Sequence, residues 1–180
     1  MRVNKTKLFG VLIIEPDLAV DERGFFKETF KVDRYCDIGI SLPFVQDNFS
    51  HSYKGVLRGL HFQKSQPQGK LVSCISGSVY DVVVDIDVKS KTFASYVGVE
   101  LSEQNHLQLW IPPGYAHGFC VLSKYADLHY KCTNFYSSAD EAGLIWNDPD
   151  VAIDWPIKSP LLSKKDKLLP SLKEIKNISK

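Results

Sequence analysis

Residues 70–86 read KLVSCISGSVYDVVVDI, and this stretch decides the fold class. Val, Ile and Tyr recur at positions that suit a pleated strand, and Ser-Gly-Ser divides the stretch into two β-rich runs. The pattern predicts two strands joined as a β-hairpin. Helical periodicity is nearly absent from this part of the chain, so we expect a mainly β protein.

Further short apolar runs follow at close spacing. They are SYVGVEL (95–101), HLQLWI (106–111), GFCVL (118–122), DLHYKCTNFY (127–136) and GLIWN (143–147). Many short strands with turn residues about every ten positions are typical of a sandwich or barrel, in which a sheet doubles or closes to bury one face. The pattern therefore predicts a jelly roll with few short helices, which we expect near 32–39, 102–105, 163–167 and 170–176.

The composition bounds the size and the class of the protein. A chain of 180 residues with 44% apolar and 24% charged residues is typical of one globular domain with one core. We expect a single domain over 1–180, with 156–180 as a C-terminal extension packed on the barrel. The net charge is only +1, which gives no electrostatic footprint for nucleic acid.

Apolar stretches and cysteines point to a cytoplasmic protein. The run VLII (11–14) is too short for the core of a signal peptide, and no stretch approaches the roughly 18 apolar residues of a membrane span. We therefore expect a cytoplasmic protein that does not bind a membrane. Cys36, Cys74, Cys120 and Cys132 form no CxxC pair, so we expect buried free thiols rather than a zinc site or disulfides.

The segment VLRGLHFQ (56–63) gathers polar side chains that suit chemistry. Arg58, His61 and Gln63 lie at alternating or nearly alternating positions of a strand, and Lys70 follows beyond a turn. They combine a planar anion binder, a group that titrates near neutrality and a movable cation. Taken alone, a histidine in a strand is more often structural, so the neighbours carry the functional interpretation.

A second histidine stands in WIPPGYAHGF (110–119), with the spacing PxGxxH at Pro112, Gly114 and His117. This spacing is similar to the second motif of the cupin superfamily, where the matching histidine is often a metal ligand. Metal-binding cupins pair it with an earlier HxH and a nearby Glu. Here the earlier stretch reads HFQ (61–63), so one of the imidazoles is missing. We therefore expect no bound metal.

Two more residues have a structural and a functional interpretation. In DLHYKCTNFY, alternation puts Tyr130 and Cys132 on the face opposite His129. Tyr130 either faces a cavity or is an ordinary core residue with its hydroxyl hydrogen-bonded. Asp166 is the single carboxylate among the lysines of LLSKKDK, and composition alone favours the surface for it.

Taken together, these segments resemble the dTDP-4-dehydrorhamnose 3,5-epimerases. The likeness rests on GFFKETF, QDNFSH, VLRGLHFQ, QGKLV, SGSVYDVVVDI, LWIPPGYAHGF, HYKCTNFY, WNDPDVAIDWP and LLSKKD, in the family's order from about Glu15 to Asp166. The resemblance implies a cupin-type jelly roll (double-stranded β-helix) that forms a homodimer and uses no cofactor or metal. It also implies 3,5-epimerisation of dTDP-4-dehydro-6-deoxy-D-glucose through an enolate, in dTDP-L-rhamnose and O-antigen biosynthesis.

The resemblance implies roles for individual residues. His61 matches the proton-abstracting base, and Asp166 matches its partner carboxylate. Lys70 matches a cation near the sugar's carbonyl oxygen, and Tyr130 matches the acid on the opposite face. The matched substrate-binding residues are Arg23, Phe26, Glu28, Gln46, Asn48, Arg58, His117 and Tyr136, the last of which stacks on the thymine base.

Alternatives remain beside the double epimerase. A related enzyme can epimerise only C3, or isomerise the ketone of another dTDP-4-keto-6-deoxy sugar. From other classes, a metal-dependent cupin oxygenase and a non-catalytic sugar-binding cupin would share the fold. The presence of both His61 and Tyr130 favours an epimerase over a ketoisomerase that lacks the pair.

Overall fold

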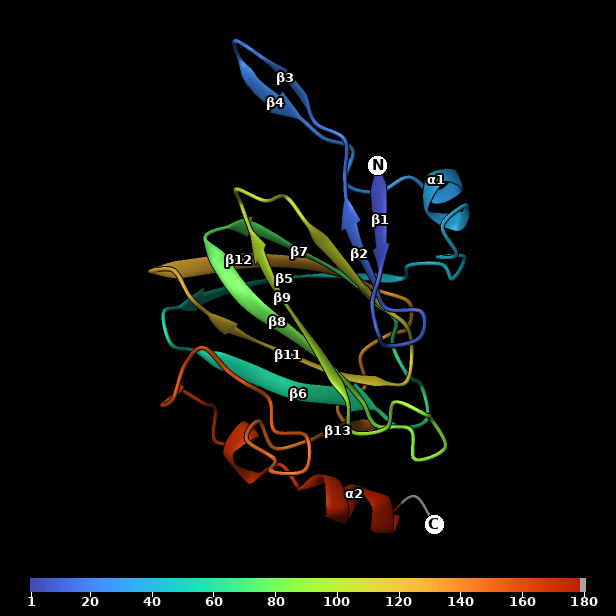
Figure 1. Ribbon diagram of the computed structural model, residues 1–180, viewed down its shortest axis with the longest axis vertical. Helices are drawn as coiled ribbons and strands as arrows, with labels where there is room; N and C mark the ends of the chain where they lie inside the picture. Colours follow the sequence, from blue (N-terminus) through green and yellow to red (C-terminus); the bar gives the residue numbers. More distant parts are fainter. Residues whose placement is uncertain (179–180) are drawn as a thin grey trace.

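Antiparallel strands in two large sheets form the body of the computed structural model, which describes residues 1–178 (Figure 1). The six-stranded sheet contains, in spatial order, β1 (Arg2–Lys5), β2 (Leu12–Glu15), β10 (Gln108–Ile111), β7 (Lys70–Ser76), β12 (Tyr125–Cys132) and β5 (Gln46–Tyr53). The five-stranded sheet contains β13 (Glu141–Gly143), β6 (Leu57–Gln63), β11 (Tyr115–Val121), β8 (Ser78–Asp85) and β9 (Tyr96–Ser102).

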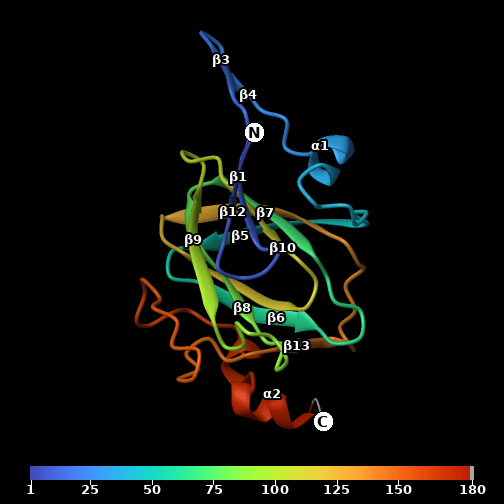
Figure 2. The ribbon, with the colours of Figure 1, turned by 45° about the vertical axis from the view of Figure 1, so that its right-hand side comes forward.

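The remaining elements lie outside these sheets. A small hairpin of β3 (Ala19–Asp21) and β4 (Gly24–Phe26) stands away from both sheets in the two views of Figures 1 and 2. The helices are α1 (Val32–Cys36), the 3₁₀ turn η1 (Asp166–Leu168) and α2 (Leu172–Ile178), which lies at the opposite end of the molecule from the hairpin. No helix in residues 1–178 is long and apolar enough to cross a membrane.

The core lies between the two sheets, as expected for a jelly roll. Val72 and Leu128 of the six-stranded sheet pack in one cluster with Val79, Val83 and Phe119 of the five-stranded sheet. Each strand alternates its side chains between this core and its outer face, so two facing sheets bury apolar area that either would expose alone. The predicted fold class, mainly β with few short helices, is confirmed.

The predicted pairing of residues 70–86 as a hairpin is wrong. Both strands exist, but β7 belongs to the six-stranded sheet and β8 to the five-stranded sheet. Gly77 between them has φ +74°, and a Cβ there would lie 2.1 Å from the carbonyl oxygen of Tyr125. The chain therefore turns sharply from one sheet into the other. A run of strand-forming residues looks the same whether consecutive strands pair or cross the core.

Several local predictions also differ from the structure. Of GLIWN (143–147), only Gly143 belongs to a strand, and residues 103–105 form a turn instead of helix. Helix is present where expected near residue 32 and in the tail. Cys36 is exposed, whereas Cys74, Cys120 and Cys132 are buried free thiols as predicted. Residues 179 and 180 of the predicted extension lie outside the described residues.

A C-terminal segment, defined here as residues 144–175, covers the outer face of the five-stranded sheet. Trp155 and Leu172 from this segment pack in one cluster with Leu57 and Val82 of the sheet. Leu161 adds backbone hydrogen bonds, accepting from the N–H of Leu57 at 3.0 Å and donating to the carbonyl of Gly55 at 2.7 Å. The segment is thereby fixed beside β6.

Candidate active site

Two adjoining cavities open among the strands. The larger has a volume of about 650 Å³ and is lined by six predicted site residues: Arg58, His61, Lys70, His117, Tyr130 and Asp166. The smaller, of about 300 Å³, shares His61, Lys70 and Tyr130 with it and adds Gln46, Asn48 and Tyr136. Volumes of this size are typical of sites for small molecules. The structure therefore brings together all but three of the predicted site residues.

A bulge in β6 lets Arg58 and His61 face the same cavity. The register pairs His117 of β11 with His61 and Phe119 with Arg58, so three steps along β6 match two along β11. Close approach of the strands needs glycine at this point. Gly59 has φ +114°, and a Cβ on it would lie 2.6 Å from the Cα of Gly118.

His61 and Tyr130 line the larger cavity from different sheets. His61 belongs to β6 of the five-stranded sheet, whereas Tyr130 belongs to β12 of the six-stranded sheet. Tyr130 lines the cavity and also packs against the core between the sheets, so both interpretations of this residue describe part of its surroundings. Lys70 lies on β7 beside β12, on the same sheet as Tyr130. An imidazole and a phenol thus line one cavity from different sheets.

Asp166 orients His61. Its Oδ1 lies 2.7 Å from Nε2 of His61, and the carboxyl group is almost completely buried on η1, although composition alone favoured the surface. Burial raises the pKa of Asp166, but hydrogen bonds from His61 and Ser163 outweigh it, so the net pKa is below the usual value. Asp166 is therefore ionised at neutral pH and accepts a hydrogen bond from the Nε2–H of His61.

The other ring nitrogen of His61 is left available as a base. The carboxylate nearest to Nδ1 is that of Glu141, whose Oε1 lies 3.9 Å away, too far for a hydrogen bond. With Nε2 committed to Asp166, the lone pair of Nδ1 can accept a proton from a molecule in the cavity.

Burial shifts the pKa values of the two groups on the facing sheet. It raises the pKa of Tyr130, so this phenol stays protonated at neutral pH and suits a proton donor. It lowers the pKa of Lys70, an effect that nearby Cys132, Asp81 and Glu141 oppose. Lys70 is therefore a desolvated amine, and its protonated form would interact strongly with a developing negative charge.

Sequence reasoning missed Glu141 and Lys165. The Oε1 atom of Glu141 accepts a hydrogen bond from Nζ of Lys165 at 2.7 Å, and its Oε2 accepts one from the hydroxyl of Tyr136 at 2.9 Å. Glu141 lines the smaller cavity and Lys165 the larger. Lys165 could have been found because it precedes Asp166, but Glu141 lies in a polar stretch that looks like an ordinary loop.

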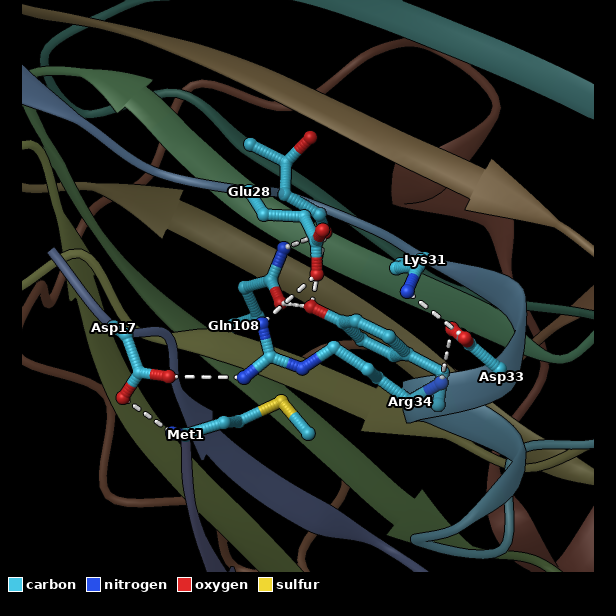
Figure 3. A network of polar contacts seen from close by, with 9 residues as sticks. Met1, Asp17, Glu28, Lys31, Asp33, Arg34 and Gln108 are labelled. Carbon is cyan, nitrogen blue, oxygen red and sulfur yellow. Dashed lines mark hydrogen bonds and ion pairs between the residues drawn. The ribbon is translucent and has the colours of Figure 1, made fainter. Parts of the chain in front are cut away.

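Arg23, Phe26 and Glu28 are not brought to this site. Arg23 forms an ion pair with Asp21 on the hairpin, and Phe26 is 73% exposed there. Glu28 accepts a hydrogen bond from Nη1 of Arg34 at 3.0 Å, as Figure 3 shows. Of the residues that the structure describes, these three predicted contacts are the ones that line neither cavity.

His117, in the cupin-like motif, forms a hydrogen bond with Asp81. Its Nε2 lies 2.8 Å from Oδ1 of Asp81, and both side chains are buried. In residues 1–178, no group of three His, Cys, Asp or Glu side chains is arranged to hold a metal ion. Asp81 was also missed, although a carboxylate inside the apolar run VYDVVV is an unusual feature of the sequence.

Comparisons with known proteins agree on one family. The family model described as dTDP-4-dehydrorhamnose 3,5-epimerase matches residues 5–174. A dTDP-4-dehydrorhamnose 3,5-epimerase of Shigella flexneri is 54% identical over 168 residues, which cover 92% of this chain and 93% of that protein.

Solved structures extend the likeness to the fold. The dTDP-6-deoxy-D-glucose-3,5-epimerase of Legionella pneumophila Philadelphia 1, in complex with dTDP-4-keto-L-rhamnose, has a TM-score of 0.94 and 51% identity, covering 97% of this chain and 94% of that one. A 3'-monoepimerase of Streptomyces bikiniensis, in complex with dTDP-quinovose, has a TM-score of 0.92 but 30% identity, covering 97% and 89%. The fold alone does not separate the two activities. The two 3,5-epimerases named above are more similar in sequence to this chain than this monoepimerase is.

The depressed pKa of Asp166 predicts a pH-dependent contribution to stability. We expect Asp166→Asn to lower the free energy of unfolding by about 1–3 kcal/mol at pH 7, the range for a hydrogen bond to a charged group. Because the folded-state pKa lies below the unfolded one, the difference from wild type should be full above about pH 5 and shrink as the pH falls below about 4. Urea unfolding of both proteins across this pH range measures the difference in unfolding free energy. A difference that stays constant or grows in acid contradicts the lowered pKa of Asp166.

Proposed function

The chain belongs to the dTDP-4-dehydrorhamnose 3,5-epimerase family, and from this premise we propose that it converts dTDP-4-dehydro-6-deoxy-D-glucose to dTDP-4-dehydro-L-rhamnose, with His61 as base and Tyr130 as acid. The protein is then an isomerase acting on a nucleotide-linked sugar. The observation that carries the proposal is that His61 and Tyr130 line one cavity from different sheets.

Proton abstraction is the first step. The protons on C3 and C5 are weakly acidic because the ketone at C4 can hold the resulting charge as an enolate. Nδ1 of His61 takes the proton, and the carboxylate of Asp166 stabilises the imidazolium that forms. General-base catalysis contributes about 10²- to 10⁴-fold in rate, so the enolate must also be stabilised.

Lys70 supplies that stabilisation. Its ammonium group lines the same cavity, where it can lie beside the oxygen that becomes negative. A fixed donor of this kind contributes about 3–4 kcal/mol, because it acts on the transition state more strongly than on the substrate.

Reprotonation from the other side completes the inversion. Tyr130 gives its hydroxyl proton to the carbon on the face away from His61, and exchange with solvent then returns a proton to the tyrosinate and removes one from the imidazolium. C3 and C5 flank the same ketone. One base, one acid and one cation therefore serve both centres when the sugar ring turns within the cavity.

The nucleotide supplies binding energy for orientation. Arg58 donates from Nε to Ser52 Oγ at 3.0 Å and from Nη2 to the carbonyl of His51 at 3.5 Å, and its remaining N–H groups can bind a pyrophosphate. Gln46 and Asn48 line the smaller cavity, where Tyr136 offers a half-exposed ring on which a base can stack. Contacts remote from the reacting carbons hold the sugar in register. The proposed mechanism uses no metal or cofactor.

We further propose that the protein is a homodimer in which the hairpin of one protomer reaches the site of its partner. Arg23, Phe26 and Glu28 match nucleotide contacts of the family but lie outside the cavities of their own chain. Val20, Phe25 and Phe26 on the hairpin are exposed, as are Phe49 and Tyr53 on the edge strand β5. Exposed apolar surface of this extent favours an interface.

Domain boundaries and location complete the proposal. We propose one domain over residues 1–180, with 156–180 as an extension, which is supported by the packing of Trp155 and Leu172 on the five-stranded sheet. Cytoplasmic location and a role in O-antigen synthesis remain predictions.

Deuterium uptake tests the reaction directly. We expect incubation with dTDP-4-dehydro-6-deoxy-D-glucose in heavy water to label both C3 and C5, and a matching reductase to convert the product to dTDP-L-rhamnose. His61→Asn should abolish both labels, a loss of at least about 10²-fold, while still binding dTDP in a calorimeter. Label at C3 alone would make the protein a 3-epimerase, and full labelling by His61→Asn would remove His61 from the mechanism.

Subunit mixing tests the shared site. Arg23→Ala should raise KM about 10- to 100-fold through loss of a charge-assisted hydrogen bond, whereas the control Arg2→Ala, also exposed, should not. Mixing Arg23→Ala with His61→Asn protomers under exchange should restore activity, because each mixed dimer has one site with both residues intact. A monomer in light scattering, or no recovery on mixing, contradicts the dimer proposal.

A further inference from the structure

Asp81 is a buried carboxylate that the proposed mechanism leaves unused. It lies on β8 with 0% exposure, between Val79 and Val83, which belong to the core between the sheets. Its Oδ1 contacts Nε2 of His117 at 2.8 Å, and its Oδ2 is buried without a hydrogen-bond partner among residues 1–178. Burying a carboxylate is costly unless it is paired, so this position calls for a specific role.

The contact with Asp81 decides what His117 presents to the cavity. His117 lines the larger cavity and stands opposite His61 in the β6–β11 register. Burial lowers the pKa of His117, more strongly than the charge of Asp81 raises it, so the ring is neutral at neutral pH. A neutral ring that donates Nε2–H to Asp81 carries an unshared pair on Nδ1. Its cavity side is therefore a hydrogen-bond acceptor.

Lys70 also experiences the charge of Asp81. Burial lowers the pKa of Lys70, and Cys132, Asp81 and Glu141 act in the opposite direction. Burial raises the pKa of Cys132, which is therefore a neutral thiol at neutral pH. Asp81 and Glu141 are then the negative groups that oppose the effect of burial on the pKa of Lys70.

We propose that Asp81 is a positioning residue for the epimerisation: it fixes His117 as the Nε2–H tautomer, so that Nδ1 accepts a hydrogen bond from a hydroxyl group of the sugar. As a second effect, its charge favours the cationic form of Lys70 beside the enolate oxygen. The inference rests on the proposed function, because the sugar hydroxyl belongs to that substrate. The inference goes beyond that function by assigning Asp81 the role of positioning the His117 side chain.

Other titratable groups near Asp81 can contribute to the same pH range. Asp81 interacts electrostatically with Lys70, Cys74, His117 and Cys120. His61 acts on His117 in turn, and Tyr130 packs against the same core. On β9, the side chains that pack against this core are Val97, Val99 and Leu101, which do not titrate. In the proposal Lys70 acts as a cation, so its deprotonation sets the alkaline limb of activity.

Kinetics of Asp81→Asn test the inference. We expect kcat to fall about 10- to 100-fold, the range for loss of a partner that orients a functional histidine. The alkaline limb of kcat/KM should move to lower pH, because loss of the negative charge lowers the pKa of Lys70 further. The matched control is Asp85→Asn, a buried carboxylate on the same strand that accepts hydrogen bonds from Ser90 and Thr92. It should keep the wild-type kcat and pH profile.

A purely structural role for Asp81 would give a different result. It would reduce the amount of active protein without moving the alkaline limb. Wild-type kcat and pH profile in Asp81→Asn, or an equal shift of the limb in Asp85→Asn, overturns the proposal.

Nitrogen NMR of the wild-type protein tests the tautomer even where Asp81→Asn does not fold. With ¹⁵N-labelled histidine, the His117 ring, identified by its absence from the spectrum of His117→Gln, should be the neutral Nε2–H form at pH 7.5. An Nδ1–H tautomer or a charged ring contradicts the inference. This measurement needs no substrate, so it separates failure of the inference from failure of the proposed function, in which the wild type would leave the sugar unlabelled.

Discussion

Inversion requires a proton to leave one side of a planar intermediate and another to arrive on the opposite side. In this protein the two sheets hold the base and the acid apart. His61 is fixed on one sheet and Tyr130 on the other. Packed sheets lie roughly 10 Å apart, and the shared apolar core holds that spacing. Polar side chains from β5, β6, β7, β11 and β12 line the cavity, so both sheets contribute to it. The fold thus fixes the geometry that the chemistry needs.

Two local features adapt the sheets to this task. A bulge in β6 turns both Arg58 and His61 towards the cavity, and Gly59 facing Gly118 lets β6 and β11 approach closely. The C-terminal segment then carries Asp166 to His61, 105 positions away along the chain. Backbone hydrogen bonds at Leu161 fix this segment beside β6. The orientation of the base therefore depends on the packing of the chain's last part as well as on the barrel.

The alternation of side chains along strands made much of the sheet structure and of the site predictable from the sequence. Alternation correctly placed Tyr130 on an inward face, and the strand VLRGLHFQ correctly grouped Arg58 with His61. Pattern alone did not reveal that β7 and β8 belong to different sheets, because Gly77 needs the positions of its distant neighbours to be interpreted. Asp166 looked like a surface residue since its burial depends on contacts made by the folded tail. The resemblance to the family supplied that residue, and geometry alone supplied Asp81 and Glu141.

A crystal structure with a bound dTDP-6-deoxy sugar that lacks the ketone, and so cannot react, measures the central geometry most directly. The account predicts that Nδ1 of His61 and the hydroxyl of Tyr130 lie on opposite faces of the sugar ring, each directed at C3 or C5. Both groups on one face of the ring, or a sugar bound outside the space between the two sheets, would contradict it.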